Sequence, residues 1–417
     1  MKLSALADRA YGGPATPAGM WVPVQALGKI YPHFGSRFKT VESTVEPSAT
    51  YPGEMIELGI GAYFDCDPRI VAAAVASLQS GLTRYHTSTA LKTLIARKIA
   101  DEYAVDIAPD KQVMVMGGAR PGIILSLLAG VDPGDRVLIP DPDYIGLMQA
   151  ACAIGAEVVR VPMLRSSHGR LAPDLDRFED LAREGVKAIL ITNPNNPTGH
   201  VWSREELGVL SGIAEQHGAF VAVNEVYDRL VFTGKSHTTY LSVGNPENAI
   251  VFGGPAKIYE MTGFGVGWII SSAHNIATFE DLLFLTHQSR ASNAAQYAAA
   301  AALTPPVREE AAEKARVRLL ENAHTTVRAL DGVHGCRCAL PAAGQFAFPW
   351  VGVDDIELTQ FLKARFGLQI VPGSVWGSQG HGHLRIALAN EPVVQAEGLA
   401  RLVAGFAAFP KKRNPNT

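Results

Sequence analysis

Seven consecutive residues, Asn193 to Gly199, form the most informative loop of this chain. They read Asn-Pro-Asn-Asn-Pro-Thr-Gly and follow the apolar run 188–191, which has the pattern of a buried parallel strand. Turn-forming residues directly after such a strand predict a rigid loop at the carboxyl edge of a sheet, where α/β proteins bind ligands. A plain turn before a helix capped by Ser203 would not require two Asn-Pro steps in succession. The loop is therefore predicted to line a ligand site.

Two further residues follow strand-like runs at fixed distances from Asn196. Asn224 lies 28 residues beyond it, and Lys257 lies 61 residues beyond it, directly after an apolar run that ends at Phe252. A lysine taken alone is more often a surface charge. In a desolvated pocket, however, burial lowers the pKa of the amine and favours its neutral form, which can attack a carbonyl carbon. Lys257 is thus a candidate nucleophile.

The loop, Asn224 and Lys257, in this order and spacing, resemble the class I/II aminotransferases, which are fold-type I enzymes dependent on pyridoxal 5'-phosphate (PLP). The stretch Met261-Thr262-Gly263-Phe264-Gly265-Val266-Gly267-Trp268 after the lysine is also similar, and the resemblance covers roughly residues 50–400. It implies that Lys257 forms a Schiff base with PLP. It also implies a substrate that is an α-amino or α-keto acid, and a homodimer with shared active sites.

The resemblance also assigns roles to residues elsewhere in the chain. Asn196 and Tyr227 match the residues that bind the phenolic oxygen of PLP, and Tyr144 matches the aromatic residue that stacks on its ring. The remaining matches are Asn224 opposite the pyridine nitrogen, Tyr85 toward the partner subunit's phosphate, Arg385 on the substrate carboxylate, Gly61 lining the substrate site, and Arg290 toward a distal substrate group. An arginine inside an apolar strand, as in His383-Leu384-Arg385-Ile386-Ala387-Leu388, needs an anionic partner in any case.

Three positions depart from the family pattern. The family has an aspartate where this chain has Asn224, and a neutral amide cannot supply the negative charge that keeps the pyridine nitrogen protonated. The family arginine eight residues after the lysine is Gly265. The serine three residues before the lysine is Gly254, and Ala256 directly precedes it. The phosphate cup has therefore lost one charge and hydroxyl groups.

The loop Gly117-Gly118-Ala119-Arg120 offers a replacement phosphate site. It follows the strand-like run 113–116 and precedes a predicted helix, so backbone N–H groups of Gly118 and Ala119 can hold an anion at the helix N-terminus. We predict that the guanidinium of Arg120 takes over the task of the missing arginine. Otherwise Arg120 is a surface arginine at an unfavourable end of the helix dipole.

Three functions remain open from the sequence. The first is a PLP-dependent aminotransferase, supported by Lys257, Asn196, Tyr227, Tyr144 and Arg385. The second is other PLP chemistry, namely a lyase, a cyclase, a β/γ-replacement enzyme or an oxidase, because a less electrophilic ring suits steps without a long-lived carbanion. The third is an aminotransferase fold that no longer uses PLP.

A site built from these residues requires a sheet whose strands end at one edge, so that the segments after the strands lie together. Strand-like runs alternate with helical stretches between about 112 and 270, at 113–116, 137–139, 158–161, 188–191, 220–223, 249–252 and 267–270. The alternation predicts an α/β fold with a three-layer large domain, a mostly parallel sheet and a smaller α+β domain. Helices are predicted at 69–80, 91–103 and about 294–330. The predicted divisions are an N-terminal segment (1–50) packing on the small domain, a large PLP-binding domain (51–310) and a small C-terminal domain (311–417).

Bulk properties exclude several classes of protein. The 417 residues include 37 Lys and Arg against 40 Asp and Glu, so the net charge of −3 does not favour nucleic-acid binding. No apolar stretch reaches the roughly 18 residues of a membrane span, and the N-terminus lacks a signal-peptide pattern. Four cysteines form neither a disulfide framework nor a zinc site, so no metal is predicted. A cytoplasmic enzyme is expected.

Overall fold

The computed structural model describes residues 51–61, 66–166, 170–232, 234, 236–285 and 290–410. These residues all belong to one compact unit. The predicted N-terminal segment, residues 1–50, lies outside the described residues. No helix in the described part of the chain is long and apolar enough to cross a membrane.

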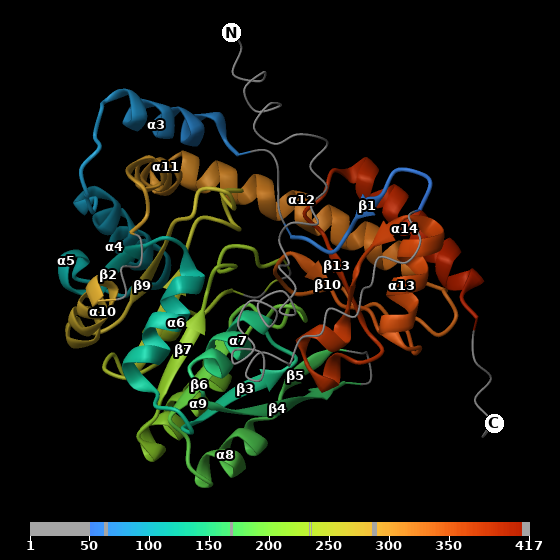
Figure 1. Ribbon diagram of the computed structural model, residues 1–417, viewed down its shortest axis with the longest axis horizontal. Coiled ribbons are helices and arrows are strands. Elements are labelled where there is room, and N and C mark those ends of the chain that lie inside the picture. The colour runs from blue at the N-terminus through green and yellow to red at the C-terminus, as the bar shows by residue number, and fades with distance from the viewer. Residues whose placement is uncertain are drawn as a thin grey trace, which may run out of the picture. The chain divides into compact units, whose positions relative to one another are not determined.

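An eight-stranded sheet forms the centre of the fold, in the order β2-β9-β8-β7-β6-β3-β4-β5 (Figure 1). The pairings of β3 with β4 and β6, of β6 with β7, and of β7 with β8 are parallel, whereas β9 pairs antiparallel with β2 and β8, and β5 with β4. The strands are β2 (Val113–Met116), β3 (Arg136–Asp141), β4 (Glu157–Arg165), β5 (Leu171–Pro173), β6 (Ala188–Thr192), β7 (Phe220–Asn224), β8 (Ala249–Gly253) and β9 (Gly267–Ile270).

Helices cover both faces of this sheet. They are α3 (Pro68–Gln79), α4 (Thr89–Tyr103), α5 (Pro109–Gln112), α6 (Ala119–Gly130), α7 (Ile145–Ala153), α8 (Leu175–Arg183), α9 (Arg204–His217), α10 (Ala273–Leu285) and α11 (Asn293–Leu303). Local signals define several of their ends. In α9, for example, Ser203 and Glu206 form a capping box, and Gly218 ends the helix with a φ of 65°.

Alternate residues of the buried strands pack in opposite directions, as the period of a strand requires. Leu190 of β6 and Ala222 of β7 belong to a core cluster with α6, α7 and α10, whereas Ile191 and Val223 belong to a cluster with α8 and α9. Because both faces are covered, these strands are apolar throughout. The three-layer α/β architecture predicted from the sequence is confirmed.

The C-terminal part holds smaller sheets and long helices. β10 (Phe346–Ala347), β13 (Leu384–Ala387) and β12 (Val371–Pro372) form one sheet, and β1 (Ile56–Glu57) pairs with β11 (Leu368–Gln369). The helices are α12 (Val307–Leu330), α13 (Asp355–Phe366) and α14 (Pro392–Ala408), with three 3₁₀ turns in the described chain, η2 (Tyr240–Ser242), η3 (Gly373–Trp376) and η4 (Ser378–Gly380). α12 runs through the predicted boundary at 310/311, so that division remains a prediction.

Candidate active site

Five of the predicted site residues lie in segments that follow strands of the central sheet. Gly118 follows β2, Tyr144 follows β3, Asn196 follows β6, Tyr227 follows β7 and Lys257 follows β8. The carboxyl ends of neighbouring parallel strands meet at one edge of a sheet. The fold therefore brings together residues that are up to 139 positions apart in the sequence.

Lys257 is held in a mostly buried position beside a backbone carbonyl. Its Nζ atom donates a 2.9 Å hydrogen bond to the carbonyl oxygen of Gly61. Burial is the main cause that lowers the pKa of this amine to about 8, and the nearby cations Arg385 and Arg120 lower it further. A larger fraction of the amine is therefore neutral near physiological pH than for an exposed lysine, as a nucleophile or proton carrier requires.

Gly61 occupies a position where a side chain has no room. A Cβ atom at this residue would lie 2.7 Å from Cζ of Phe346 and 3.0 Å from Oε1 of Gln345. The Nε2 atom of Gln345 in turn donates to the backbone oxygen of Lys257 at 3.3 Å. The absence of a side chain at Gly61 thus allows its carbonyl to approach Lys257.

Asn196 and Tyr227 are neighbours at the bottom of the site, and both are buried. The Nδ2 atom of Asn196 lies 3.4 Å from the hydroxyl of Tyr227, to which it donates. Burial raises the pKa of Tyr227 far above its usual value, so its hydroxyl stays protonated and can donate to an oxygen. The two residues that the sequence assigns to one ligand oxygen are therefore adjacent.

Arg385 of β13 extends from the small sheet toward the same residues. Its Nη1 atom donates to Oδ1 of Asn196 at 3.3 Å, and its Nη2 atom donates to the carbonyl oxygen of Gly59 at 2.7 Å. Burial lowers the pKa of this guanidinium to about 10, which leaves it charged at neutral pH. Its hydrogen bonds go to neutral acceptors, so the guanidinium retains capacity for an anion.

Asn224 ends β7 and is 4% exposed. Its backbone oxygen accepts from the backbone N–H of Asn193 at 3.0 Å, but its buried side-chain Oδ1 has no hydrogen-bond partner among the described residues. Buried polar atoms are nearly always paired in folded proteins, so an unpaired one at this edge of the sheet suits a polar group of a ligand.

Arg120 lies in the first turn of α6 and turns toward Tyr144. Its Nε atom donates to the Tyr144 hydroxyl at 3.0 Å, and its guanidinium carbon lies 5.7 Å from the centre of that ring. Gly118 is the N-cap of α6 with a φ of 116°, which favours glycine. The N–H of Gly118 itself donates to the carbonyl oxygen of Met116 at 2.8 Å, so the backbone donors left at this helix start begin with Ala119. These donors, together with the Arg120 guanidinium, form a site that suits phosphate.

Three glycines on either side of Lys257 differ in the space around them. A Cβ atom on Gly267 would lie 2.6 Å from the backbone nitrogen of Ala119, so this glycine allows β9 to pack against the start of α6. Gly265 has a φ of 63° in open space, and a Cβ atom on Gly254 would lie 3.3 Å from the carbonyl oxygen of Val266. An arginine at position 265 would thus adopt a strained backbone conformation.

Two predicted site residues lie apart from this group. Tyr85 is fully exposed, in a segment that Asn293 anchors by donating to the backbone oxygens of Leu82 and Arg84. Arg290 is engaged within the chain, because its guanidinium forms an ion pair with Glu280 at 2.5 Å and donates to Thr87. Neither contacts Lys257 or Arg385 in the described hydrogen bonds.

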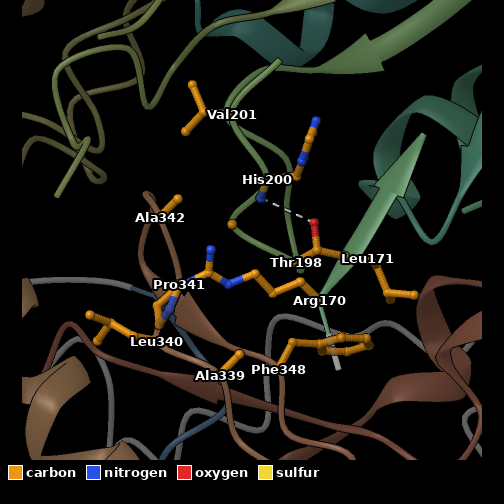
Figure 2. A pocket seen from close by; sticks show the side chains of 11 residues that line it. Arg170, Leu171, Thr198, His200, Val201, Ala339, Leu340, Pro341, Ala342 and Phe348 are labelled. Atoms are coloured by element: carbon orange, nitrogen blue, oxygen red, sulfur yellow. Dashed lines mark hydrogen bonds between the residues drawn. The ribbon is translucent and has the colours of Figure 1, made fainter. Parts of the chain in front are cut away.

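A separate pocket is bordered by Thr198 and Gly199 at the end of the loop that carries Asn196. Figure 2 shows Arg170 reaching across it toward Pro341, with His200 donating from its backbone to the Thr198 hydroxyl. Leu171, Gly199, Val201, Ala339, Leu340, Ala342 and Phe348 complete its wall. It contains none of the predicted site residues. Among the residues that the structure describes, no group of acidic, His or Cys side chains could hold a metal ion.

Sequence reasoning missed the aromatic side chains around Arg385. Its guanidinium carbon lies 3.9 Å from the centre of the Phe346 ring and 4.1 Å from that of Trp376. The charge of Arg385 signals that some partner must exist. Nothing in the sequence around Phe346 or Trp376 indicates that their rings are those partners.

The residues present fit most of the functional groups of PLP. Lys257 would supply the amine for its aldehyde, Asn196 and Tyr227 would offer donors to the ring oxygen, and the start of α6 with Arg120 would offer an anion site. The unpaired Oδ1 of Asn224 can accept from a protonated ring nitrogen. The hydrogen-bonding groups are therefore adequate for PLP, although Asn224 carries no negative charge opposite the ring nitrogen.

Known proteins that resemble this chain are aminotransferases. An aspartate aminotransferase of Thermotoga maritima is 31% identical over 331 residues, which cover 78% of this chain and 85% of that protein. An aspartate aminotransferase of Pyrococcus abyssi is 28% identical over 363 residues, which cover 84% of this chain and 91% of that protein. The crystal structure of an aromatic aminotransferase from Pyrococcus horikoshii has a TM-score of 0.79 at 25% identity, covering 85% of this chain and 96% of that one. The family model for aminotransferase class I and II matches residues 53–403, and the chain therefore belongs to this family of transferases.

Proposed function

We propose that this protein transfers the amino group between an α-amino acid and an α-keto acid, with PLP attached through Lys257. The observation that carries the proposal is the position of the Lys257 amine, buried and hydrogen-bonded to Gly61, in the field of Arg385 and with a pKa lowered to about 8. Bound PLP would supply an aldehyde that takes up the amino group and a ring that accepts electrons.

The chain's own side chains would carry out the remaining steps. Arg385 binds the substrate carboxylate and fixes the direction in which the Cα–H bond points. The Lys257 amine, which is neutral in part near pH 8, would take the proton from the substrate Cα and hold it for return as a general acid. Asn196 and Tyr227 would keep the ring oxygen hydrogen-bonded, and Arg120 with the backbone N–H of Ala119 would hold the phosphate, because the N–H of Gly118 already donates to Met116.

A homodimer with shared sites forms part of the proposal. Large apolar side chains are exposed on α3, where Val71, Val75 and Leu78 recur on one helical face, and Tyr297 of neighbouring α11 is also exposed. Such a surface is typical of a protein–protein interface. Fully exposed Tyr85 suits contact with the phosphate in the partner subunit, and Arg290 remains a candidate for a distal substrate group only if it leaves Glu280.

The names of the relatives favour transamination over other PLP chemistry, although they include both aspartate and aromatic aminotransferases and so leave the substrate side chain open. Asn224 is the observation that favours the second candidate, in which the reaction avoids a long-lived carbanion. A cytoplasmic location is also proposed, on the grounds that the four cysteines are free and partly buried.

The test is a visible absorption titration of the purified protein with PLP, beside Lys257→Ala. We expect an absorption band that requires Lys257, and borohydride reduction followed by peptide mass analysis should place the cofactor on that residue. Conversion of added α-keto acid to amino acid would then establish transamination. A flat spectrum at saturating PLP would refute PLP use, and a band without amino transfer would favour the second candidate.

A further inference from the structure

Two aromatic rings lie against the Arg385 guanidinium. Its central carbon is 3.9 Å from the centre of the Phe346 ring and 4.1 Å from that of Trp376. Such cation–π contacts stabilise a cation without occupying its N–H groups. A carboxylate bound by these N–H groups would therefore lie close to both rings.

Two buried N–H donors at this place have no acceptor. The Nη1 and Nη2 atoms of Arg385 each make a hydrogen bond, but Nε has no partner among the described residues. The same is true of the indole Nε1 of Trp376, a residue that is 3% exposed. Unpaired buried donors are rare, and two on neighbouring side chains suit a ligand acceptor that both could share.

The backbone around Trp376 is fixed by a group of polar contacts. Its carbonyl oxygen accepts from Nη2 of Arg160 at 2.6 Å, and this guanidinium lies 3.6 Å from Asp141. Asp141 accepts from both the backbone nitrogen (3.0 Å) and the hydroxyl (2.8 Å) of Ser378. The segment that carries the indole is thus tied to β3 and β4 of the central sheet, which holds the donor in place before any ligand binds.

We propose that Trp376 is a second carboxylate-binding residue, whose indole N–H donates to an oxygen of the same substrate carboxylate that Arg385 binds. This inference rests on the proposed function. The carboxylate would satisfy Nε of Arg385 and Nε1 of Trp376 together, and an amine without a carboxylate would leave both unpaired. The pair would therefore contribute to selection of α-amino acids over simple amines.

The variant Trp376→Phe tests this, because it keeps an aromatic ring on Arg385 and removes the N–H group. Binding is followed through the spectrum of the PLP-loaded protein with two matched pairs of probes, L-phenylalanine with 2-phenylethylamine and L-alanine with ethylamine. We expect the concentration of amino acid that gives half-saturation to rise about tenfold, as for loss of one hydrogen bond to a charged group. The concentration of amine that gives half-saturation should change less than twofold.

Ligand-free stability provides a second readout. Trp376→Phe removes a donor that has no partner, so the melting temperature should stay the same or rise. The matched control is Trp202→Phe, because Nε1 of Trp202 donates to the carbonyl oxygen of Thr192 at 3.2 Å and its loss should lower the melting temperature.

Equal weakening of amino acids and amines would overturn the inference and leave Trp376 a packing residue. Unchanged binding of all four probes would overturn it as well. If the unaltered protein with bound PLP responded to none of the probes, the proposed function itself would fail, and this inference with it.

Discussion

The Nη1 atom of Arg385 donates a 3.3 Å hydrogen bond to Oδ1 of Asn196, and thereby joins β13 of the small sheet to the loop after β6 of the central sheet. The amide nitrogen of the same Asn196 donates to Tyr227. The proposed ligand of the substrate carboxylate and the proposed partners of the cofactor oxygen thus form one connected group. A substitution at either end is expected to alter binding of both substrate and cofactor.

Asn224→Asp should make cofactor binding stronger while weakening the ligand-free fold. A carboxylate close to a protonated ring nitrogen contributes several kcal/mol of Coulomb energy at an effective dielectric constant of ~20, before solvation offsets it. Without PLP the same carboxylate is buried and unpaired. Melting curves with and without PLP measure both effects. The exposed Asn245→Asp is the control, and equal shifts in both states would contradict the prediction.

Arg120→Gln should weaken PLP binding at least tenfold, because it removes the charge beside the N-terminus of α6. Pyridoxal without its phosphate distinguishes this role from a general loss of structure. Its affinity should change little, since the ring contacts remain. Arg97→Gln, at another exposed arginine, is the control for net charge. If the affinities for PLP and pyridoxal fell equally, Arg120 would instead act by holding Tyr144 in place.

The lowered pKa of Lys257 predicts a stability that depends on pH in the ligand-free protein. Burial and the nearby arginines lower this pKa from 10.5 to about 8, so the folded protein binds fewer protons than the unfolded chain between these values. The contribution of Lys257 to stability therefore rises with pH in that window. Lys257→Met should be more stable than the parent below pH 8, by up to about 3 kcal/mol.

That gain should vanish as the pH approaches 10.5, which urea unfolding at several pH values would show. The exposed Lys111→Met serves as the control and should show no such trend. A stability difference that is constant with pH would mean that the amine is not perturbed by its surroundings.

The apolar face of α3 should be required for dimerisation. Val75 and Leu78 are 45% and 71% exposed, and Val75→Glu/Leu78→Glu would place two charges in the proposed interface. We expect a dimer in the parent and monomers in this variant by sedimentation equilibrium. Val393→Glu, at an equally apolar and exposed position of α14, should leave the dimer intact. The assignment would be refuted if the parent and the Val75→Glu/Leu78→Glu variant were both monomeric or both dimeric.

The sequence predicted the strands of the sheet well because all but one are continuous apolar runs, the exception being 158–161 with Arg160. All seven predicted strands are present, together with helices close to 69–80 and 91–103. The helical stretch predicted at about 294–330 is two helices, α11 and α12, which are separated at Pro305 and Pro306. β5 was missed, since its three residues include Pro173, which is unfavourable inside a strand. The segments that carry Tyr144, Asn196 and Lys257 follow strands as the sequence predicted, whereas the roles of the site residues come from the family resemblance and stay predictions.

Other features of the site depend on contacts that no local pattern encodes. Arg385 meets Phe346 and Trp376 only because the small sheet and η3 bring them together. The contact of Arg120 with Tyr144 similarly joins the start of α6 to the segment after β3. The ion pair of Arg290 with Glu280 was also not foreseen, and it occupies a side chain that the resemblance assigned to substrate.

Gly265 combines a left-handed backbone conformation with the loss of the family arginine. Replacement of Gly265 by arginine would therefore supply the charge, but the new residue would have a strained backbone conformation. In a directed-evolution experiment, revertants at position 265 should be rare unless a neighbouring loop position changes as well. Selection for tighter retention of the coenzyme should enrich substitutions around Arg120 first. The backbone conformation at position 265 thus limits the substitutions by which affinity for a bound phosphate could change.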